Sequence, residues 1–194
     1  MKSMPIKLIV GLGNPGPEYE QTRHNAGSWL VHAMIIQHGS KLSADKKFHG
    51  HSSKIKFSDS DVHFLLPNTY MNRSGMAVSA MSTFYKIQAE EILIVHDELD
   101  LEPGKVRIKL GGGHGGHNGL RDIIAALGTP NFYRLRIGIG HPGDKNRVVD
   151  YVLGKPSTLD RQRIDEAIAE SIRHMDQIIR GEINTVMNTL HKLT

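Results

Sequence analysis

Short apolar runs separated by turn-forming residues predict the strands of this chain. The run at 92–95 is continuously apolar, which is typical of a central strand buried on both faces. Residues 6–10 predict a second short buried strand, and 106–110 alternates between polar and apolar positions. The remaining strands are expected at 52–57 and 62–66, joined as a hairpin by the polar residues 58–61, and at 134–140.

Apolar residues spaced three to four positions apart predict helices between and after these strands. The first helix begins near Ala26. Ser157 resembles the start of a capping box for a long helix that Gly181 would end, and one short helix follows. Residues 39–50 are polar and predict a loop. The residues expected on the core-facing sides of the helices are Ala26, Trp29, Leu30, Ala33 and Met34; Val78, Met81, Phe84 and Tyr85; Leu120, Ile123, Ile124 and Leu127; Ile164, Ala167, Ile168, Ile172, Met175 and Ile179; and Ile183, Val186, Met187 and Leu190.

The elements follow one another mostly as strand then helix, with one hairpin. This order predicts an α/β fold: a single domain spanning 1–194, with a mixed, mostly parallel twisted sheet flanked by helices. The chain has no cysteine, which excludes disulfides and thiolate metal sites. It has no signal peptide and no apolar run of membrane-spanning length, so we expect a cytoplasmic protein with no membrane partner.

The formal net charge is only +4, but the charges are unevenly distributed. Residues 90–102 are rich in acids, whereas 105–147 are mainly basic. The alternation in 106–110 would place Lys105, Arg107 and Lys109 on one face. Such a face suits a polyanion, although a solvated surface explains the same charges equally well.

The glycine-rich segment after the first strand matches G-x-G-x-x-G at 11–16, the dinucleotide-binding pattern. The last glycine of that pattern should open a helix that holds a pyrophosphate. Here Pro15 and Pro17 flank Gly16, and the helical spacing begins several residues later. An acidic residue is also missing from 29–39, where the pattern requires one for the ribose. We therefore expect no nucleotide cofactor.

Polar residues suited to catalysis follow several of the predicted strands, where α/β folds place their sites. A histidine paired with an aspartate can take a proton from water, and asparagine amides can stabilise an oxygen that gains negative charge. No G-x-S-x-G motif and no cysteine offer a covalent route. The set therefore suits attack of water on an activated ester. We expect one cleft to be lined by His24, Asp97, Asn14, Asn72 and Asn118.

Each of these residues also has a purely structural explanation. His24 would serve a helix start, and Asp97 would brace a loop. Asn14 would make a local turn before proline, and Asn72 would cap a helix. Met71 is expected to pack rather than react.

Two further hypotheses concern metal and phosphate. A metal site would draw on His96, Asp97, Glu98, His114 and His117, but no set of known ligand spacing is present. The glycine-rich run 111–119 lacks the Gly-Lys-Ser/Thr ending of a Walker loop. Its amides would form an anion-binding nest, or its glycines would only let the loop pass close to a neighbour.

Taken together, the motifs resemble those of the bacterial-type peptidyl-tRNA hydrolases. The chain carries GLGNPG at 11–16 with Tyr19, TRHNAG at 22–27, PNTYMNRSG at 67–75, HDELDL at 96–101, GGGHGGHNGLRDI at 111–123 and RLRIGIGHP at 134–142. The resemblance runs from about residue 6 to residue 156, and the glycine-rich block is its most distinctive part.

This resemblance implies a hydrolase that cleaves the ester between a peptide and the terminal ribose of tRNA, without a metal or another cofactor. It makes His24 the base that activates water, with no covalent intermediate, and Asp97 its partner. It assigns Asn14, Asn72 and Asn118 to the catalytic site. The residues implied for substrate are Tyr19, Tyr70, Met71 and His117, and those for the tRNA phosphates of the acceptor stem are Lys109 and Arg136 with Lys105 and Arg107. We expect a monomer; the competing hypothesis is an RNA-binding module without catalysis.

Overall fold

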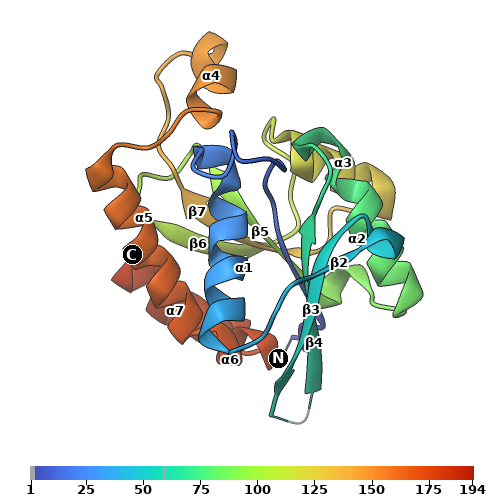
Figure 1. The fold of residues 1–194 in the computed structure, drawn as a ribbon. Helices are drawn as coiled ribbons and strands as arrows, with labels where there is room; N and C mark the ends of the chain where they lie inside the picture. The colour runs from blue at the N-terminus through green and yellow to red at the C-terminus, as the bar shows by residue number, and fades with distance from the viewer. Residues whose placement is uncertain (1–2, 59) are drawn as a thin grey trace.

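The computed structural model describes residues 3–58 and 60–194, and this part of the chain forms one seven-stranded mixed sheet (Figure 1). Its strand order is β2-β3-β4-β1-β5-β7-β6. The four inner strands β4, β1, β5 and β7 run parallel, while β2, β3 and β6 pair antiparallel with their neighbours. The strands are β1 (Leu8–Gly11), β2 (Ser43–Asp45), β3 (Gly50–Phe57), β4 (Ser60–Pro67), β5 (Ile92–Glu98), β6 (Val106–Leu110) and β7 (Tyr133–Gly138).

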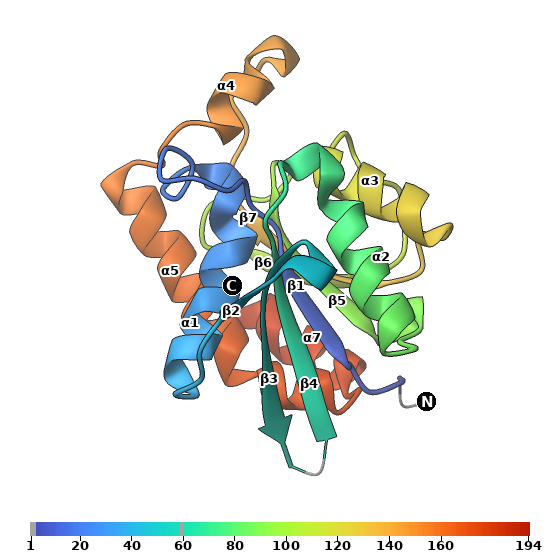
Figure 2. The ribbon, with the colours of Figure 1, turned by 45° about the vertical axis from the view of Figure 1, so that its right-hand side comes forward.

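Helices cover both faces of this sheet (Figure 2). Two apolar cores result, one under α1 and the C-terminal helices α5 to α7 and the other under α2 and α3. The helices are α1 (Ala26–Gln37), α2 (Ser74–Phe84), α3 (Asn118–Leu127), α4 (Val148–Val152), α5 (Thr158–Arg173), α6 (Met175–Ile179) and α7 (Ile183–Leu193). Short 3-10 turns are η1 (Arg23–Asn25), η2 (Lys46–Phe48), η3 (Met71–Arg73), η4 (Ala89–Glu91) and η5 (Lys145–Arg147). The predicted single α/β domain with a mixed sheet is therefore confirmed.

The continuous apolar runs occupy the middle of the sheet, as predicted. β5 pairs in parallel with β1 on one side and β7 on the other. All four residues of β1 and the first six of β5 are buried, because helices cover both faces there. None of the helices in residues 3–58 and 60–194 is long and apolar enough to cross a lipid bilayer.

The predicted hairpin is present, since β3 and β4 pair antiparallel from Gly50–Pro67 to Phe57–Ser60. Its link is shorter than expected, because Ser60 and Asp61 already belong to β4. Asp59, within the predicted link, lies outside the described residues.

Four details differ from the predictions. The segment 39–50 is not only a loop: it holds the exposed edge strand β2 and the turn η2, too short and polar to produce an apolar pattern. The long C-terminal helix breaks at His174 into α5 and α6, and the apolar stripe continues across the break. Phe84 and Tyr85 at the end of α2 are exposed, and their rings cover the buried ring of Phe48 from the outside. No element was predicted where the short helix α4 forms, and it stands away from the body (Figure 1).

Two close contacts position the segments that carry the candidate chemistry. Helix α1 approaches β5 at Gly27, where a Cβ atom would lie 2.1 Å from the carbonyl oxygen of Val95. On the outer edge of β6, α7 supplies acceptors for two strand N–H groups. The Nε2 atom of His191 accepts from Ile108 at 3.0 Å, and the Thr194 hydroxyl accepts from Val106 at 3.2 Å.

Candidate active site

A cavity of about 330 Å³ holds the residues expected to form the cleft. His24, Asp97, Asn14, Asn72 and Asn118 all line it. Its wall also includes Tyr70, Met71, His117, Lys109 and Arg136. A larger groove of about 1020 Å³ runs along α1 and α5, but of these ten residues only Asn14 lines that groove. The chemistry therefore belongs to the smaller cavity.

Three of the predicted residues lie outside that wall. Tyr19 contacts the site indirectly: its ring packs edge-on against Tyr70, with centroids 6.2 Å apart. The Lys105 ammonium donates to the carbonyl oxygen of Thr194, and the Arg107 guanidinium donates to the hydroxyl of the same residue. These two cations therefore meet the end of the chain rather than the cavity.

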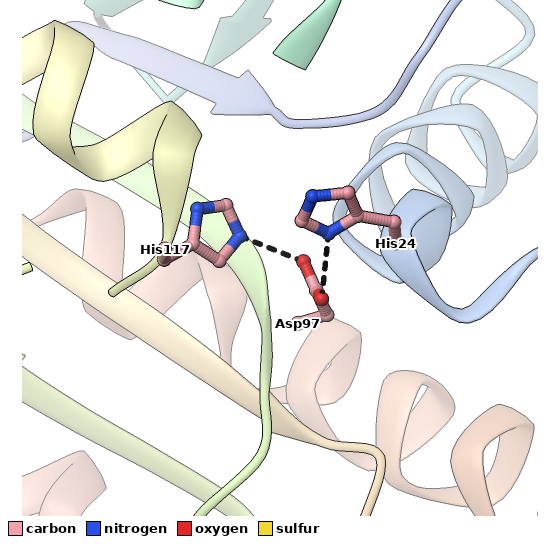
Figure 3. A group of neighbouring side chains, drawn as sticks. All are labelled: His24, Asp97 and His117. Carbon is pink, nitrogen blue, oxygen red and sulfur yellow. Dashed lines mark hydrogen bonds and ion pairs between the residues drawn. The ribbon is translucent and has the colours of Figure 1, made fainter. Parts of the chain in front are cut away.

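His24 and Asp97 form the central pair of the site (Figure 3). The turn η1 carries His24, and β5 carries Asp97 near its carboxyl end. The Nδ1 atom of His24 lies 2.8 Å from Oδ2 of Asp97, and both side chains are buried. Because a carboxylate can only accept, His24 donates from Nδ1, and its Nε2 atom keeps a lone pair when the ring is neutral.

Electrostatics fix the charge of this pair. Burial disfavours an ionised Asp97, but the attraction of His24 and the hydrogen bonds from His24 and His117 hold its pKa well below the usual value. Burial likewise opposes a charged His24, yet the attraction and hydrogen bond of Asp97 outweigh it, so the pKa of His24 is raised. An ionised Asp97 thus makes His24 a stronger base.

A second imidazole, that of His117, binds the other oxygen of Asp97. Its Nε2 atom lies 2.8 Å from Oδ1, and its ring centroid lies 5.0 Å from that of His24. Its Nδ1 atom accepts from the backbone N–H groups of Gly119 and Leu120 at the start of α3. Since a backbone N–H can only donate, His117 is the neutral tautomer protonated on Nε2. Of the two alternatives for the glycine-rich run, the anion-binding nest therefore cannot use the Gly119 and Leu120 amides, because both donate to His117.

Asn14 makes a long-range contact rather than only a local turn. Its Oδ1 atom accepts from the backbone N–H of Met71 at 2.7 Å. That bond fixes the orientation of the amide, so Nδ2 is the group that Asn14 can offer to another molecule.

The other candidate side chains occupy the wall as follows. Asn72 lies within η3 and is not a helix cap, because the residue before α2 is Arg73. Asn118 is the first residue of α3, next to His117. Met71 is buried in the core under α2 and α3, as its packing role predicts. Its sulfur would lie 2.6 Å from a Cβ at Gly119, so that glycine lets α3 approach closely.

Two buried polar residues of this wall were not predicted as catalytic or substrate-binding residues: His96, which was considered only as a metal ligand, and Arg134. His96 is buried and donates from Nδ1 to the carbonyl oxygen of Asp97, at 2.8 Å. Burial lowers the pKa of His96 to about 3. The buried guanidinium of Arg134 donates to the carbonyls of Gly112 and Gly113, which supports the glycine-rich loop. The sequence could have indicated Arg134, because it lies two residues before Arg136 in β7 and therefore on the same face of the sheet.

The cations of β6 and β7 share one face of the sheet. Arg107 pairs in register with Arg136, and Lys109 with Arg134, so all four side chains project to the same side. The Arg136 guanidinium donates to the Glu98 carboxylate at 2.8 Å. Burial and the neighbouring charges of Arg136 and Arg134 lower the pKa of Lys109. Lys109, Arg134 and Arg136 of this basic face also line the cavity, and the Arg134 guanidinium is already bound to the carbonyls of the glycine-rich loop.

The residues that could hold a metal ion in the structure differ from the set expected from the sequence. Ligand atoms of His24, Asp97 and His117 all lie within 4.8 Å of one another. The two nitrogen–oxygen distances of 2.8 Å are hydrogen-bond distances. Ligands around a tetrahedral zinc ion would lie about 3.3 Å apart, from zinc–ligand bonds of about 2.0 Å. The arrangement therefore fits a hydrogen-bonded triad better than a metal site.

Comparisons with known proteins show the family to which the chain belongs. A family model described as peptidyl-tRNA hydrolase matches residues 8–194. A peptidyl-tRNA hydrolase of Sodalis glossinidius is 56% identical, over 97% of each chain. One from Neisseria meningitidis is 54% identical, over 97% of this chain and 98% of its own. The crystal structure of peptidyl-tRNA hydrolase from Acinetobacter baumannii superposes with a TM-score of 0.93 at 53% identity, covering 96% of this chain and 94% of that one.

Proposed function

Because the chain belongs to the peptidyl-tRNA hydrolase family, we propose that it hydrolyses the ester between peptide and tRNA with water that His24 activates. The reaction returns free tRNA to translation. The observation that carries the mechanism is the buried 2.8 Å pair of His24 and Asp97. It supports a base whose pKa is raised and whose Nε2 atom can accept a proton.

The proposed reaction needs one displacement at the ester carbonyl. His24 takes a proton from water at Nε2 while the water oxygen bonds to the carbonyl carbon. The carbon–oxygen bond to the ribose then breaks, and His24 returns the proton to the leaving ribose oxygen. The products are a peptide with a free carboxyl group and a tRNA with a free terminal hydroxyl. Asp97 stabilises the imidazolium ion that exists between the two proton transfers.

Amide donors would stabilise the carbonyl oxygen as it becomes negative. Asn14 offers Nδ2, since Oδ1 is held by the Met71 N–H. Asn118 is proposed to place the water or the substrate, and Asn72 lines the same wall. Met71 and His117 would shape the side of the cavity that takes the peptide, and Tyr19 and Tyr70 its entrance.

The tRNA would approach over the basic face. Lys109 and Arg136 are the proposed phosphate contacts, because they combine that face with the cavity wall. Lys105 and Arg107 lie farther along the same edge and would add positive charge toward the acceptor stem. We further propose that the protein acts as a monomer in the cytoplasm and needs no metal, so that activity survives a strong chelator.

The decisive experiment compares His24→Ala with the unchanged protein, on N-acylated aminoacyl-tRNA and on the unacylated form. Loss of a general base predicts a fall in kcat of roughly 10² to 10⁴-fold, with tRNA affinity nearly unchanged. His38→Ala is the matched control, because His38 is an exposed residue at the end of α1. If His24→Ala instead weakens tRNA binding and leaves kcat intact, His24 is a binding residue. If the unchanged protein binds tRNA without cleaving the ester, the chain is an RNA-binding module.

A further inference from the structure

We propose that Asn25 is a positioning residue that holds Asn14 in place for the reaction, an inference that rests on the proposed function. Asn25 follows His24 in the turn η1, and its side chain faces the loop after β1. It does not line the cavity that contains His24. Its effect on the reaction would therefore pass through another residue.

The contact between Asn25 and Asn14 is a reciprocal pair of hydrogen bonds. The backbone N–H of Asn14 donates to Oδ1 of Asn25 at 2.9 Å, and Nδ2 of Asn25 donates to the backbone carbonyl of Asn14 at 3.0 Å. One side chain thus satisfies both main-chain groups of Asn14, as a neighbouring strand would do. Two bonds in opposite directions fix both the position and the rotation of that main chain.

The Asn14 side chain extends this link to a third segment. Its Oδ1 atom accepts from the Met71 N–H at 2.7 Å. A continuous series of hydrogen bonds therefore joins η1, which carries His24, to the loop after β1 and then to η3, which carries Asn72. The amide of Asn14 cannot rotate without breaking the bond to Met71. Its Nδ2 atom is thereby aimed relative to the base.

The surroundings of Asn25 leave its amide little freedom. The residue is 5% exposed, and it borders only the larger groove along α1 and α5. Gly13 packs directly on the amide, because a Cβ at that position would lie 2.9 Å from the Cγ atom of Asn25. The hydroxyl of Ser28 donates to the Asn25 carbonyl at 3.0 Å, which fixes the main chain of the turn. Asn25 is thus a preformed support for the loop.

A double-mutant cycle tests this role directly. Misplacement of a reacting group by about 1 Å costs up to about 10²-fold in rate, so Asn25→Ala should lower kcat/KM by roughly 10- to 100-fold. In an Asn14→Ala background the same change should cost less than about threefold, because no amide is left to position. Asn25→Asp keeps the side-chain volume and the acceptor for the Asn14 N–H. It replaces the donor with a charge that faces a carbonyl oxygen, and it should show the same dependence on background.

Controls separate positioning from general loss of structure. Ser28→Ala removes a hydrogen bond from the same turn without touching Asn14, and it should retain activity within about threefold. The acid side of the pH–rate profile should stay unchanged in Asn25→Ala, because this variant adds no charge and the pair of His24 and Asp97 remains. If Asn25→Ala does not fold, Asn25→Asp decides the question.

Two results would overturn the inference. One is an Asn25→Asp enzyme as active as the unchanged protein. The other is an equal loss with and without the Asn14 amide, which would make Asn25 a structural residue only. Both results can be obtained only if the unchanged protein is active. If the proposed function is wrong, the unchanged protein cleaves no ester, so the two failures can be told apart.

Discussion

At the scale of residues, one carboxylate organises two imidazoles with different tasks. Asp97 accepts from His24 through Oδ2 and from His117 through Oδ1. The Nδ1 atom of His117 accepts from two backbone N–H groups, whereas in the part of the chain that the structure describes no backbone N–H donates to the Nε2 atom of His24. Neutral His117 orients Asp97, and charged Asp97 raises the basicity of His24. The two rings differ because backbone N–H groups bind Nδ1 of His117, which leaves only His24 with a nitrogen that can accept a proton in the cavity.

Replacing the carboxylate tests this arrangement. Asp97→Asn should lower kcat by on the order of 10³ to 10⁴-fold, because an amide N–H facing Nδ1 of His24 would force the proton onto Nε2. The acid limb of the residual activity should move to lower pH, since the charge that raises the pKa of His24 is gone and burial lowers it. A pH series of kcat/KM measures both effects. Asp100→Asn, an exposed carboxylate on the same wall, should leave the limb in place; equal shifts in both variants would contradict the pairing.

His96 should make the protein sensitive to acid. Its pKa is about 3 when folded and near 6.5 when unfolded, so the unfolded chain binds more protons between these values. This depressed pKa means that His96 contributes stability above pH 6.5, and that the contribution is lost as pH falls toward 3. The loss should be roughly 1 kcal/mol per pH unit. Urea unfolding at pH 6.5 and 5 measures it.

The matched variants for that measurement are His96→Asn and His38→Asn. The first keeps a side-chain donor for the Asp97 carbonyl but does not titrate, so its stability should depend less steeply on pH. The second changes an exposed histidine and should follow the unchanged protein. Parallel curves for all three proteins would show that His96 does not cause the acid sensitivity.

At the scale of elements, the sequence predicted the helices and strands that a local pattern of apolar residues determines. The apolar run of β5 and the spacing of α1 identified both elements, and polar residues placed after strands identified the cleft. His96 directly follows the apolar run 92–95, and Arg134 belongs to the alternating charged and apolar pattern of β7. Neither pattern shows that these side chains are buried, which only their three-dimensional neighbours reveal. The sequence did not predict the break between α5 and α6 at His174, because apolar residues continue along the same side of both helices.

The packing of α1 on β5 sets the distance between His24 and Asp97. Gly27→Ala would place a Cβ 2.1 Å from the Val95 carbonyl oxygen, so the helix and η1 must shift outward. We expect a loss of about 1 to 3 kcal/mol in the free energy of unfolding, together with lower kcat. Gly113→Ala is the control for stability, because a Cβ there meets nothing within 4 Å. Equal stability of the two variants would contradict close packing at Gly27.

At the scale of the whole molecule, a small net charge of +4 is concentrated where the nucleic acid would lie. β6 and β7 project four cations to one side of the sheet, close to the cavity. The acid-rich segment 90–102 supplies Glu98, which orients Arg136. We expect the distribution of charge, rather than the total charge, to guide the tRNA to the cavity.

The salt dependence of tRNA binding tests whether these cations contact phosphates. Lys109→Ala and Arg136→Ala should each weaken tRNA binding and reduce the slope of log affinity against log salt concentration by about 1. Lys56→Ala removes an exposed cation from β3 and should leave the slope unchanged. Binding titrations at several salt concentrations distinguish these outcomes. An unchanged slope for Lys109→Ala would remove that residue from the phosphate contacts.

The contact between α7 and β6 bears on how this protein behaves when it is concentrated. An outer strand with free amides is a template for further strands, and stacking of that kind leads to fibrils. His191 and Thr194 occupy two such amides on β6. The helix α7 thus covers the outer edge of the sheet, and we expect that loosening its last turn would expose this edge to pairing with a strand of another molecule.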